Sequence, residues 1–230
     1  MAMCGRFALF TPMKALAAVA AAEPLSELTP FAPSWNVCPQ QHVPVATEVG
    51  VDGEQNVQRH FRLMQWGFRP SWAKPSNREP INARRETVHE KPMFRRAAEQ
   101  RRGVVPADGW YEWMTTPQGK TPWFHKSETE SPLFMAALWE GWSKNGDHLE
   151  SCVLLTQEAN LDCREVHDRM PVLLTSEGVS AWLSKGVLPA PPAAGVVVRY
   201  PVSRAVNNVR EDHPGLVQPI PRLFDHEYGV

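Results

Sequence analysis

The sequence lacks the long apolar segment of a membrane protein and the leader of a secreted one. No run of eighteen apolar residues occurs, so no stretch predicts a membrane-spanning helix. The alanine-rich stretch 11–22 is too short for a secretion signal and lacks its flanking residues. We therefore expect a cytoplasmic protein that does not engage a membrane.

Cysteine is scarce and scattered. The four cysteines, Cys4, Cys38, Cys152 and Cys163, form no C-x-x-C pair, which excludes a zinc knuckle and gives no disulfide framework. Cys163 and His167 have the i, i+4 spacing of two metal ligands, but no second pair accompanies them. We expect neither a metal nor an organic cofactor.

Net charge is also small, at −1, but it is unevenly distributed. Residues 59–102 hold twelve Lys or Arg and four Glu, whereas the remainder carries a net charge of −9. This asymmetry predicts a basic face suited to a polyanion. For the charges of 90–102 we favour the simpler interpretation of a solvated helix, and for the arginines before them we favour binding.

The chain is otherwise ordinary for one globular domain. It has 230 residues, 43% of them hydrophobic and 21% charged, and no internal repeat. We expect helices over 11–23, 90–102, 156–166 and 176–184, a hairpin of 42–48 and 56–64 around Asp52-Gly53, a strand, turn and strand over 104–113, and strands over 7–10, 122–125, 133–138, 152–156, 172–174 and 196–202.

Two tryptophans stand among cations in the irregular segment 64–74. Trp66 and Trp72 alternate with Arg69 and Lys74 in a stretch that Gly67 and Pro70 interrupt. Aromatic faces that stack on bases and cations that meet phosphates are what a single-stranded nucleic acid site needs. The alternative is a packed loop, and core burial is the better interpretation for at least one of the two.

Cys4 is the residue with the most distinctive chemistry. If residues 1–3 are removed, it presents an α-amine and a thiol on adjacent carbons, with reference pKa values of about 7.7–8.0 and about 8.5. An amine condenses with an aldehyde to a Schiff base, and the thiol can then close a five-membered thiazolidine. The alternative is an inert core cysteine, because Cys4 leads the predicted strand 7–10.

Three polar residues stand where catalytic groups are often found. Asn82 precedes two arginines, Arg84 and Arg85, which can bind phosphate oxygens, or it caps a helix. Glu112 alternates with aromatic neighbours, so it is an acid or base if its face is buried and a solvated side chain otherwise. His167 is predicted at a helix-to-strand junction, as an active-site histidine or as a helix cap.

Five short motifs in one order give the chain a family resemblance. They are Cys4-Gly5-Arg6-Phe7, Trp66-Gly67, Asn82-Ala83-Arg84, Gly109-Trp110-Tyr111-Glu112-Trp113 and His167-Asp168-Arg169-Met170-Pro171. Together they resemble the SOS response-associated peptidase (SRAP) family, from Cys4 to about residue 209. The resemblance implies an α+β fold: a single domain with a largely antiparallel, barrel-like mixed β core and a few flanking helices. We divide the chain into a leader over 1–3, the domain over 4–210 and a C-terminal tail over 211–230.

The resemblance also implies a function in the DNA damage response. Such proteins crosslink covalently to abasic sites in single-stranded DNA through an N-terminal cysteine. The implied catalytic residues are Cys4, Asn82, Glu112 and His167, and the implied DNA-binding residues are Arg6, Asn36, Pro39, Trp66, Gly67, Arg84, Arg85 and Arg169. We expect a monomer that associates with the nucleoid when bound to DNA.

This sequence departs from the family pattern at its start. Met1-Ala2 precede Met3-Cys4, whereas the resemblance implies a cysteine directly after the initiator methionine. We interpret Met1-Ala2 as residues added before the natural start, or as a leader that the family's peptidase activity removes. Two other functions stay open: a cysteine peptidase using Cys4 and His167, and a noncatalytic single-strand binder whose affinity is indifferent to Cys4→Ala.

Overall fold

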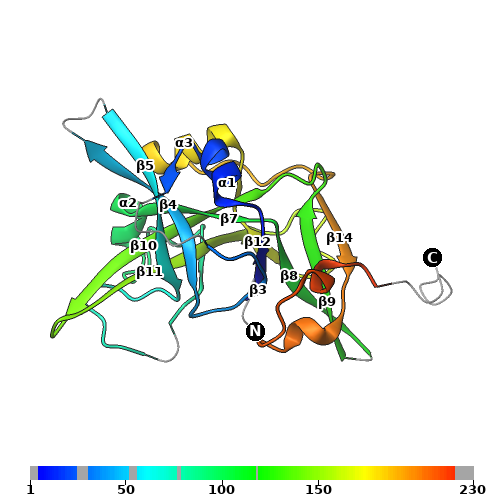
Figure 1. The fold of residues 1–230 in the computed structure, drawn as a ribbon. Helices are drawn as coiled ribbons and strands as arrows, with labels where there is room; N and C mark the ends of the chain where they lie inside the picture. The colour runs from blue at the N-terminus through cyan, green and yellow to red at the C-terminus, as the bar shows by residue number, and fades with distance from the viewer. Residues whose placement is uncertain (1–4, 25–30, 52–55, 77–78, 118, 221–230) are drawn as a thin grey trace.

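The computed structural model describes residues 5–24, 31–51, 56–76, 79–117 and 119–220 (Figure 1). The strands are β1 Phe7–Leu9, β2 Glu23–Pro24, β3 Ser34–Val37, β4 His42–Val51, β5 Asn56–Trp66, β6 Asn82–Arg84, β7 Arg102–Ala107, β8 Gly109–Thr116, β9 Gly119–Ser127, β10 Leu133–Lys144, β11 Asp147–Glu158, β12 Arg169–Pro171, β13 Leu173–Leu174 and β14 Val197–Pro201. The helices are α1 Met13–Ala20, α2 Arg95–Gln100 and α3 Ser176–Lys185, with 3-10 turns η1 Arg204–Asn207 and η2 Pro214–Val217.

Five strands of the larger sheet close into a barrel. The order β11-β10-β7-β4-β5 is antiparallel throughout, and β5 returns to β11 in parallel through the pairs Gln65↔Ser151 and Trp66↔Cys152. β6 and β12 extend this sheet, each pairing with β11. The predicted barrel-like mixed β core is therefore confirmed.

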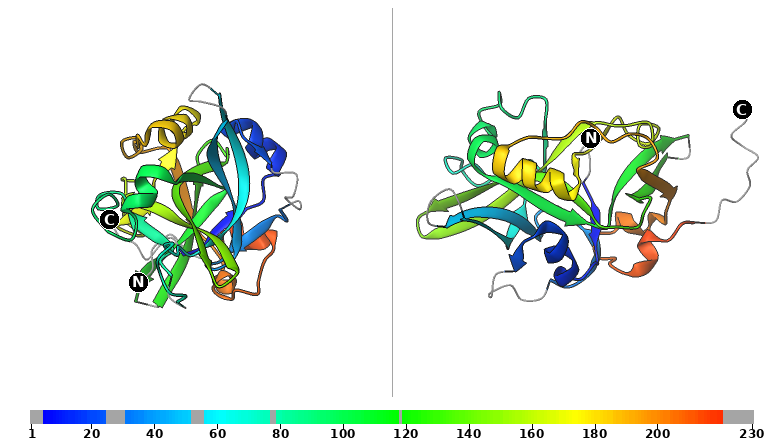
Figure 2. Two further views of the ribbon diagram at one scale, coloured as in Figure 1. Left: turned by 90° about the vertical axis from the view of Figure 1, so that its left-hand side faces the viewer. Right: turned by 90° about the horizontal axis from the view of Figure 1, so that it is seen from above.

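A second sheet of five strands, in the order β14-β9-β8-β1-β3, packs beside the barrel. Seen from above, the barrel hairpins and the β9–β14 edge lie at opposite ends of the molecule (Figure 2). Along β8 the side chains alternate: Trp110 belongs to the main core and Tyr111 to a smaller cluster with Phe124 and Leu216 on the other face. The second sheet is thus covered on both faces, by the barrel and by the C-terminal segment.

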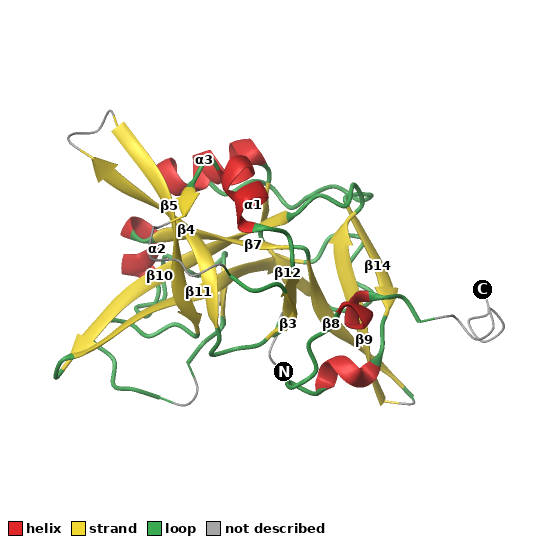
Figure 3. Cartoon of the chain, in the orientation of Figure 1, coloured by secondary structure: helices red, strands yellow, loops and turns green. Residues whose placement is uncertain are grey.

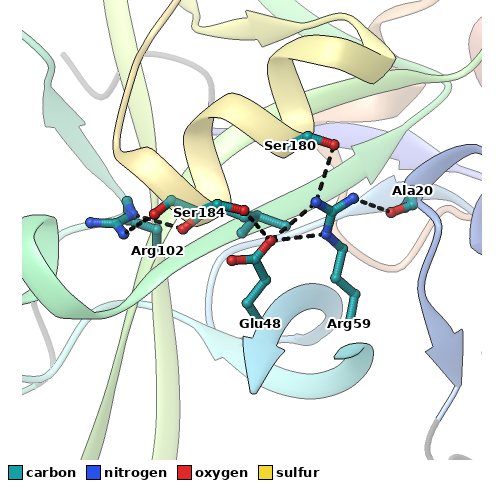
Figure 4. A network of polar contacts seen from close by, with 7 residues as sticks. Ala20, Glu48, Arg59, Arg102, Ser180 and Ser184 are labelled. Carbon is teal, nitrogen blue, oxygen red and sulfur yellow. Dashed lines mark hydrogen bonds and ion pairs between the residues drawn. The ribbon is translucent and has the colours of Figure 1, made fainter. Parts of the chain in front are cut away.

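The helices lie outside the strands, and α1 and α3 sit together over the barrel (Figure 3). A polar network joins them to the β4–β5 hairpin (Figure 4). Arg59 donates to Glu48 at 3.1 Å, to the Ser180 hydroxyl at 3.1 Å and to the Ala20 carbonyl at 3.4 Å. The Ser184 hydroxyl donates to the same Glu48 carboxylate at 2.7 Å. The Arg59 guanidinium is therefore occupied by contacts within the protein rather than presented to a ligand.

Most predicted elements are present with altered ends, and two predicted helices are wrong in extent. The helix expected over 90–102 is formed only as α2, because Pro92 lacks the amide hydrogen a helix interior needs and Arg102 is paired into β7. The helix expected from residue 11 begins at Met13, since Thr11 hydrogen-bonds Asp108 instead of capping it. The hairpin is confirmed as β4–β5, with its Asp52-Gly53 turn outside the described residues.

The predicted helix over 156–166 is not formed. β11 continues to Glu158, held there by pairing with Arg169 of β12, and turns occupy 161–166. His167 therefore follows a run of turns rather than the end of a helix. Cys163 and Val166 are buried from within the turns that stand in place of the helix.

Residues 211–220, assigned from the sequence to a C-terminal tail, pack onto the second sheet. Leu216 is fully buried, the Ile220 amide donates to the Pro201 carbonyl at 3.0 Å, and Asp212 accepts the Trp35 amide at 2.6 Å. This segment is part of the folded domain because its apolar residues cover the outer face of β8 and β9.

Candidate active site

The described chain begins at Gly5, so Cys4 lies outside the described residues. The residues after it are held firmly. The Arg6 carbonyl accepts the Tyr111 amide at 3.0 Å, and Phe7 pairs with Trp110 of β8 and with Val37 of β3. A side-chain carbon built on Gly5 would lie 3.8 Å from the Ile81 side chain. The start of the described chain therefore pairs with the strand that bears Glu112 and lies next to Ile81, the residue before Asn82.

Glu112 is a buried acid on the inward face of β8. Its side chain is 3% exposed and projects to the same side as Trp110, toward the barrel, because alternate residues share a face. Of the two sequence interpretations, the buried one is correct. Burial raises the pKa of the Cys163 thiol to about 12; Asp162 raises it further, Arg199 lowers it, and Glu112 adds a smaller increase.

His167 is anchored through its Nδ1 atom. That atom accepts the Arg169 amide at 3.0 Å and lies 3.0 Å from an oxygen of Asp168. When Nδ1 accepts from the amide, the neutral ring carries its proton on Nε2 and can only donate there. When Nδ1 instead carries a proton and donates to Asp168, Nε2 can accept a proton and return it, so proton transfer at Nε2 depends on the Asp168 contact. The backbone also fixes the residue, since the His167 amide donates to the Cys163 carbonyl at 3.1 Å.

Asn82 begins β6, which lies along β11 in parallel through the pair Asn82↔Leu154. The preceding Ile81 carbonyl accepts the Leu154 amide at 3.0 Å and the Trp66 indole at 2.9 Å. Asn82 is half-buried. Its strand is fixed on one side by β11, and Ile81, which directly precedes it, lies next to Gly5, the first described residue after Cys4.

Two further buried groups adjoin this site, and the sequence analysis did not select either for it. His125 is fully buried on β9, opposite Trp110, and stacks on its ring at 4.9 Å between centroids. Burial lowers the pKa of His125 to about 3, with smaller contributions led by Arg199, so this ring is neutral near pH 7. Cys163 is 2% exposed in the turn before His167. Only the alternation and register of β8 and β9 could have placed His125, and no pattern in the sequence indicated the burial of Cys163 in a turn.

Trp66 does not have the stacking role expected of it. Its side chain is fully buried and packs edge-on against Phe7, with 5.1 Å between ring centroids. Its ring is therefore not available to stack on a base. It contacts Phe7 of β1 on one side and donates from its indole nitrogen to the Ile81 carbonyl. Trp72 is the exposed tryptophan of this segment, at 68%. Gly67 is also buried: its φ of +155° suits glycine, and its amide donates to Cys152 at 3.0 Å.

Arg6 and Asn36, also expected to contact DNA, contact each other. The Arg6 guanidinium donates to the Asn36 carboxamide oxygen and to the Val206 carbonyl, each at 2.7 Å. Asn36 is only 2% exposed, so its side chain cannot reach a ligand in this structure. Pro39 is half-exposed in the turn that follows β3.

The other three expected DNA-binding arginines differ in availability. Arg169 donates both terminal nitrogens to Glu86 at 2.7 Å, and this pairing is the main reason that the pKa of Glu86 lies below its ordinary value. Arg85 donates to Gln157 at 2.6 Å and to the Pro189 carbonyl at 2.7 Å. Arg84 is exposed on β6, two residues from Asn82. Of the three, Arg84 is best placed to meet a phosphate.

Part of the basic stretch 59–102 is neutralised by acids of the protein. Four of its twelve cations form ion pairs: Arg59–Glu48, Arg62–Glu150, Arg69–Glu79 and Arg101–Glu140. Exposed cations with solvated positions remain at Lys74, Arg84, Lys91, Arg95 and Arg96. The expected polyanion face is therefore reduced to a few positions. Among the residues described, no cluster of three His, Cys, Asp or Glu suits a metal, and no helix has the length and apolarity to cross a membrane.

Comparison with known proteins gives the same family as the motifs. Residues 3–209 match the SOS response associated peptidase (SRAP) family. The chain is 33% identical to the abasic site processing protein YoqW of Bacillus subtilis, covering 94% of this chain and 99% of the relative. It is 32% identical to the abasic site processing protein YedK of Escherichia coli, covering 95% and 100%.

A more distant relative supports the same family, and a solved structure supports the fold. Identity to the abasic site processing protein HMCES of Gallus gallus is 30%, over 83% of this chain and 67% of the relative. The fold matches a crystal structure of a Bacteroides thetaiotaomicron protein with a TM-score of 0.77 at 21% identity, covering 95% of this chain and all of that one. With the family match spanning nearly all of the domain, the chain belongs to the SOS response associated peptidase family.

Proposed function

We propose that this protein captures abasic sites in single-stranded DNA as a covalent adduct of Cys4. The observation that carries the proposal is the convergence just described. The residues following Cys4 pair with the strand of the buried Glu112 and pass Ile81, which directly precedes Asn82. β12, which begins two residues after His167, pairs with β11, as does the strand of Asn82. The names of the relatives add the substrate, an abasic site.

The chemistry has two bond-forming steps. The Cys4 amine adds to the aldehyde carbon of the opened sugar, and loss of water gives a Schiff base. The Cys4 thiol then adds across that C=N bond, its sulfur bonding to carbon and its proton passing to nitrogen, which completes a thiazolidine. Opening the cyclic sugar and expelling water both need a proton delivered and another removed.

The described residues match these demands. Glu112 and His167 are the titratable groups of the site, and His167 has Nε2 available for proton transfer while Nδ1 stays anchored. Asn82 can hold the sugar oxygen or the amine, because a carboxamide donates and accepts at once. Arg84 meets a flanking phosphate, and the exposed Trp72 replaces Trp66 as the side chain that stacks on a base.

The reaction requires that Cys4 be the first residue. With Ala2-Met3 still attached, its nitrogen is an amide and cannot form the Schiff base. The family match begins at Met3, which supports capture by a chain that starts at Cys4. We include in the proposal that removal of the preceding residues, by this protein itself or by an aminopeptidase, activates it.

The test is an intact-mass and denaturing-gel assay with single-stranded DNA containing one abasic site. Protein whose mass shows Cys4 as its first residue should give a heat-stable adduct, and DNA with a reduced sugar analogue that has no aldehyde should give none. Cys4→Ser keeps the amine, so it should form an adduct only when borohydride reduces the Schiff base. Cys4→Ala should behave in the same way, since only the thiol is lost.

Two outcomes would overturn the proposal. If the mass-verified protein forms no adduct but its DNA binding is salt-sensitive and indifferent to Cys4→Ala, the protein is a noncatalytic binder. If it forms no adduct but shortens its own leader or a peptide in a reaction that needs Cys4 and His167, it is a peptidase.

A further inference from the structure

The segment that follows β14 is tied to the strand that follows Cys4 through one buried side chain. Asn36 lies on β3, next to β1, and its carboxamide is 2% exposed. Its oxygen accepts the Arg6 guanidinium at 2.7 Å. Its nitrogen donates to the carbonyls of Glu211 at 2.6 Å, Asn208 at 3.1 Å and Val206 at 3.4 Å. One amide thus joins Arg6 to three backbone positions of 204–220.

The neighbouring contacts reinforce this joint. The Val206 carbonyl also accepts Arg6 at 2.7 Å. The Trp35 amide donates to Asp212 at 2.6 Å, and the Trp35 carbonyl accepts the Tyr111 hydroxyl at 2.7 Å. The C-terminal segment therefore fixes the position of β3, and β3 in turn fixes β1, with which it pairs. Of the three carbonyls that Asn36 binds, those of Val206 and Asn208 lie within the family match and that of Glu211 lies beyond it.

Only a carboxamide satisfies both sides of the joint. An aspartate in place of Asn36 would turn acceptors toward three carbonyl oxygens, which also are acceptors, and an alanine would leave Arg6 and the carbonyls without their partner. The side chain of Arg6 projects away from the Glu112 face, because Phe7 faces the main core and neighbours on a strand alternate. Arg6 and Asn36 therefore act on the site through the backbone of β1.

We propose that Asn36 is a positioning residue for adduct formation, and that its hydrogen bonds to residues 204–220 hold it in the required position. This inference rests on the proposed capture of abasic sites by Cys4. Residues 5 and 6 set the direction from which the amine reaches the sugar, and the joint fixes Arg6 at its side chain as well as its backbone. Loss of the joint slows the reaction of bound DNA, because misplacement by about 1 Å can cost on the order of a hundredfold in rate.

The experiment separates positioning from DNA binding. For Asn36→Ala and Asn36→Asp, the rate constant of crosslinking at saturating abasic DNA and the Kd for the same strand without the lesion are measured well below each variant's Tm. We expect the rate constant to fall about 10- to 100-fold with a Kd changed by less than about twofold. A DNA contact would raise the Kd and leave the saturated rate unchanged, and that result would overturn the proposal.

Two further variants keep the result interpretable. Asn208→Ala is the matched control, because it retains the backbone carbonyl that accepts from Asn36 and loses only an exposed side-chain hydrogen bond to the Arg210 amide. Its rate constant should equal that of the unmodified protein. Asp212→Ala, which removes one outer contact, should slow crosslinking by a smaller factor if Asn36 variants fail to fold. If the Asn36 and Asp212 variants fold and crosslink as fast as the unmodified protein, the inference is wrong.

A small free aldehyde distinguishes the two proposals. Its thiazolidine formation with Cys4 needs no positioned DNA, so Asn36→Ala should match the unmodified protein in that reaction. If the unmodified protein does not crosslink to abasic DNA at all, the proposed function has failed. If it crosslinks and Asn36→Ala is as fast, only the positioning role has failed.

Discussion

At the scale of residues, the two tryptophans of segment 64–74 have opposite roles. Trp72→Ala should weaken binding to single-stranded DNA by about 5- to 150-fold, the loss of one stacked base, with little change in stability. Trp66→Ala should destabilise the protein by about 3–5 kcal/mol, because it empties a core site against Phe7. Fluorescence anisotropy and thermal unfolding measure the two effects. Equal loss of affinity in both variants, after correction for unfolded protein, would contradict this assignment.

The buried histidine predicts a pH dependence of stability. The pKa of His125 is about 3 in the folded protein and about 6.5 when unfolded. Above pH 6.5 both states are neutral and stability is complete. As pH falls from 6.5 toward 3 the unfolded state takes up the proton first, so stability declines by up to about 1.4 kcal/mol per pH unit from this group.

Replacing His125 by Phe keeps an aromatic ring against Trp110 and removes the titration. Denaturant unfolding between pH 7 and pH 4 should therefore show a shallower decline in His125→Phe than in the unmodified protein. Parallel curves would show that the histidine titrates normally in the folded state.

The sequence could predict residue types but not their surroundings. Asn82, Glu112 and His167 were identified by motif, yet whether Glu112 faced inward depended on which face of β8 met the barrel. Trp66 and Asn36 could not be assigned correctly, because motif membership is equally consistent with a contact to DNA and with a buried contact that shapes the site. Burial, which decides between them, arises from pairings as distant as Asn36 with Glu211.

At the scale of elements, closure of the barrel depends on the bend after β5. Gly67 has φ +155°, and a Cβ there would lie 2.5 Å from the Gln40 amide nitrogen. Its own amide donates to Cys152 of β11, at the parallel closure. Gly67→Ala should therefore destabilise the protein by about 1–3 kcal/mol. Gly141→Ala is the control, since open space surrounds that position and its change should stay within about 0.5 kcal/mol. Denaturant unfolding of the pair checks this, and equal stabilities would refute it.

Strands were easier to predict than helices in this chain. β4, β5 and β10 have β-branched or apolar residues in long runs with clear turns, whereas the predictions of helices over 90–102 and 156–166 took no account of pairing with other strands. Pro92 shortened the first, and cross-strand pairing of Glu158 with Arg169 replaced the second. Long-range pairing thus outweighed local propensity, which single-sequence patterns do not register.

At the scale of the whole molecule, part of the uneven charge of the sequence is used inside the fold. Four arginines of 59–102 form ion pairs, and one of them, Arg59, joins β5 to α1 and α3 (Figure 4). A basic stretch in sequence therefore does not translate into a basic face of equal strength. Binding to DNA should depend on a small number of exposed cations, with Arg84 nearest to Asn82.

The dependence of DNA affinity on salt tests this distribution. Arg84→Ala should raise the Kd and reduce the slope of log Kd against log salt by about 0.7, the loss of one phosphate contact on a single strand. Arg59→Ala removes an equal charge but from an internal pair, 15% and 14% exposed at its two side chains. It should leave the slope unchanged and lower the free energy of unfolding by about 2 kcal/mol. If the two variants shift the slope equally, net charge rather than position governs binding, and the basic stretch acts as a diffuse field after all.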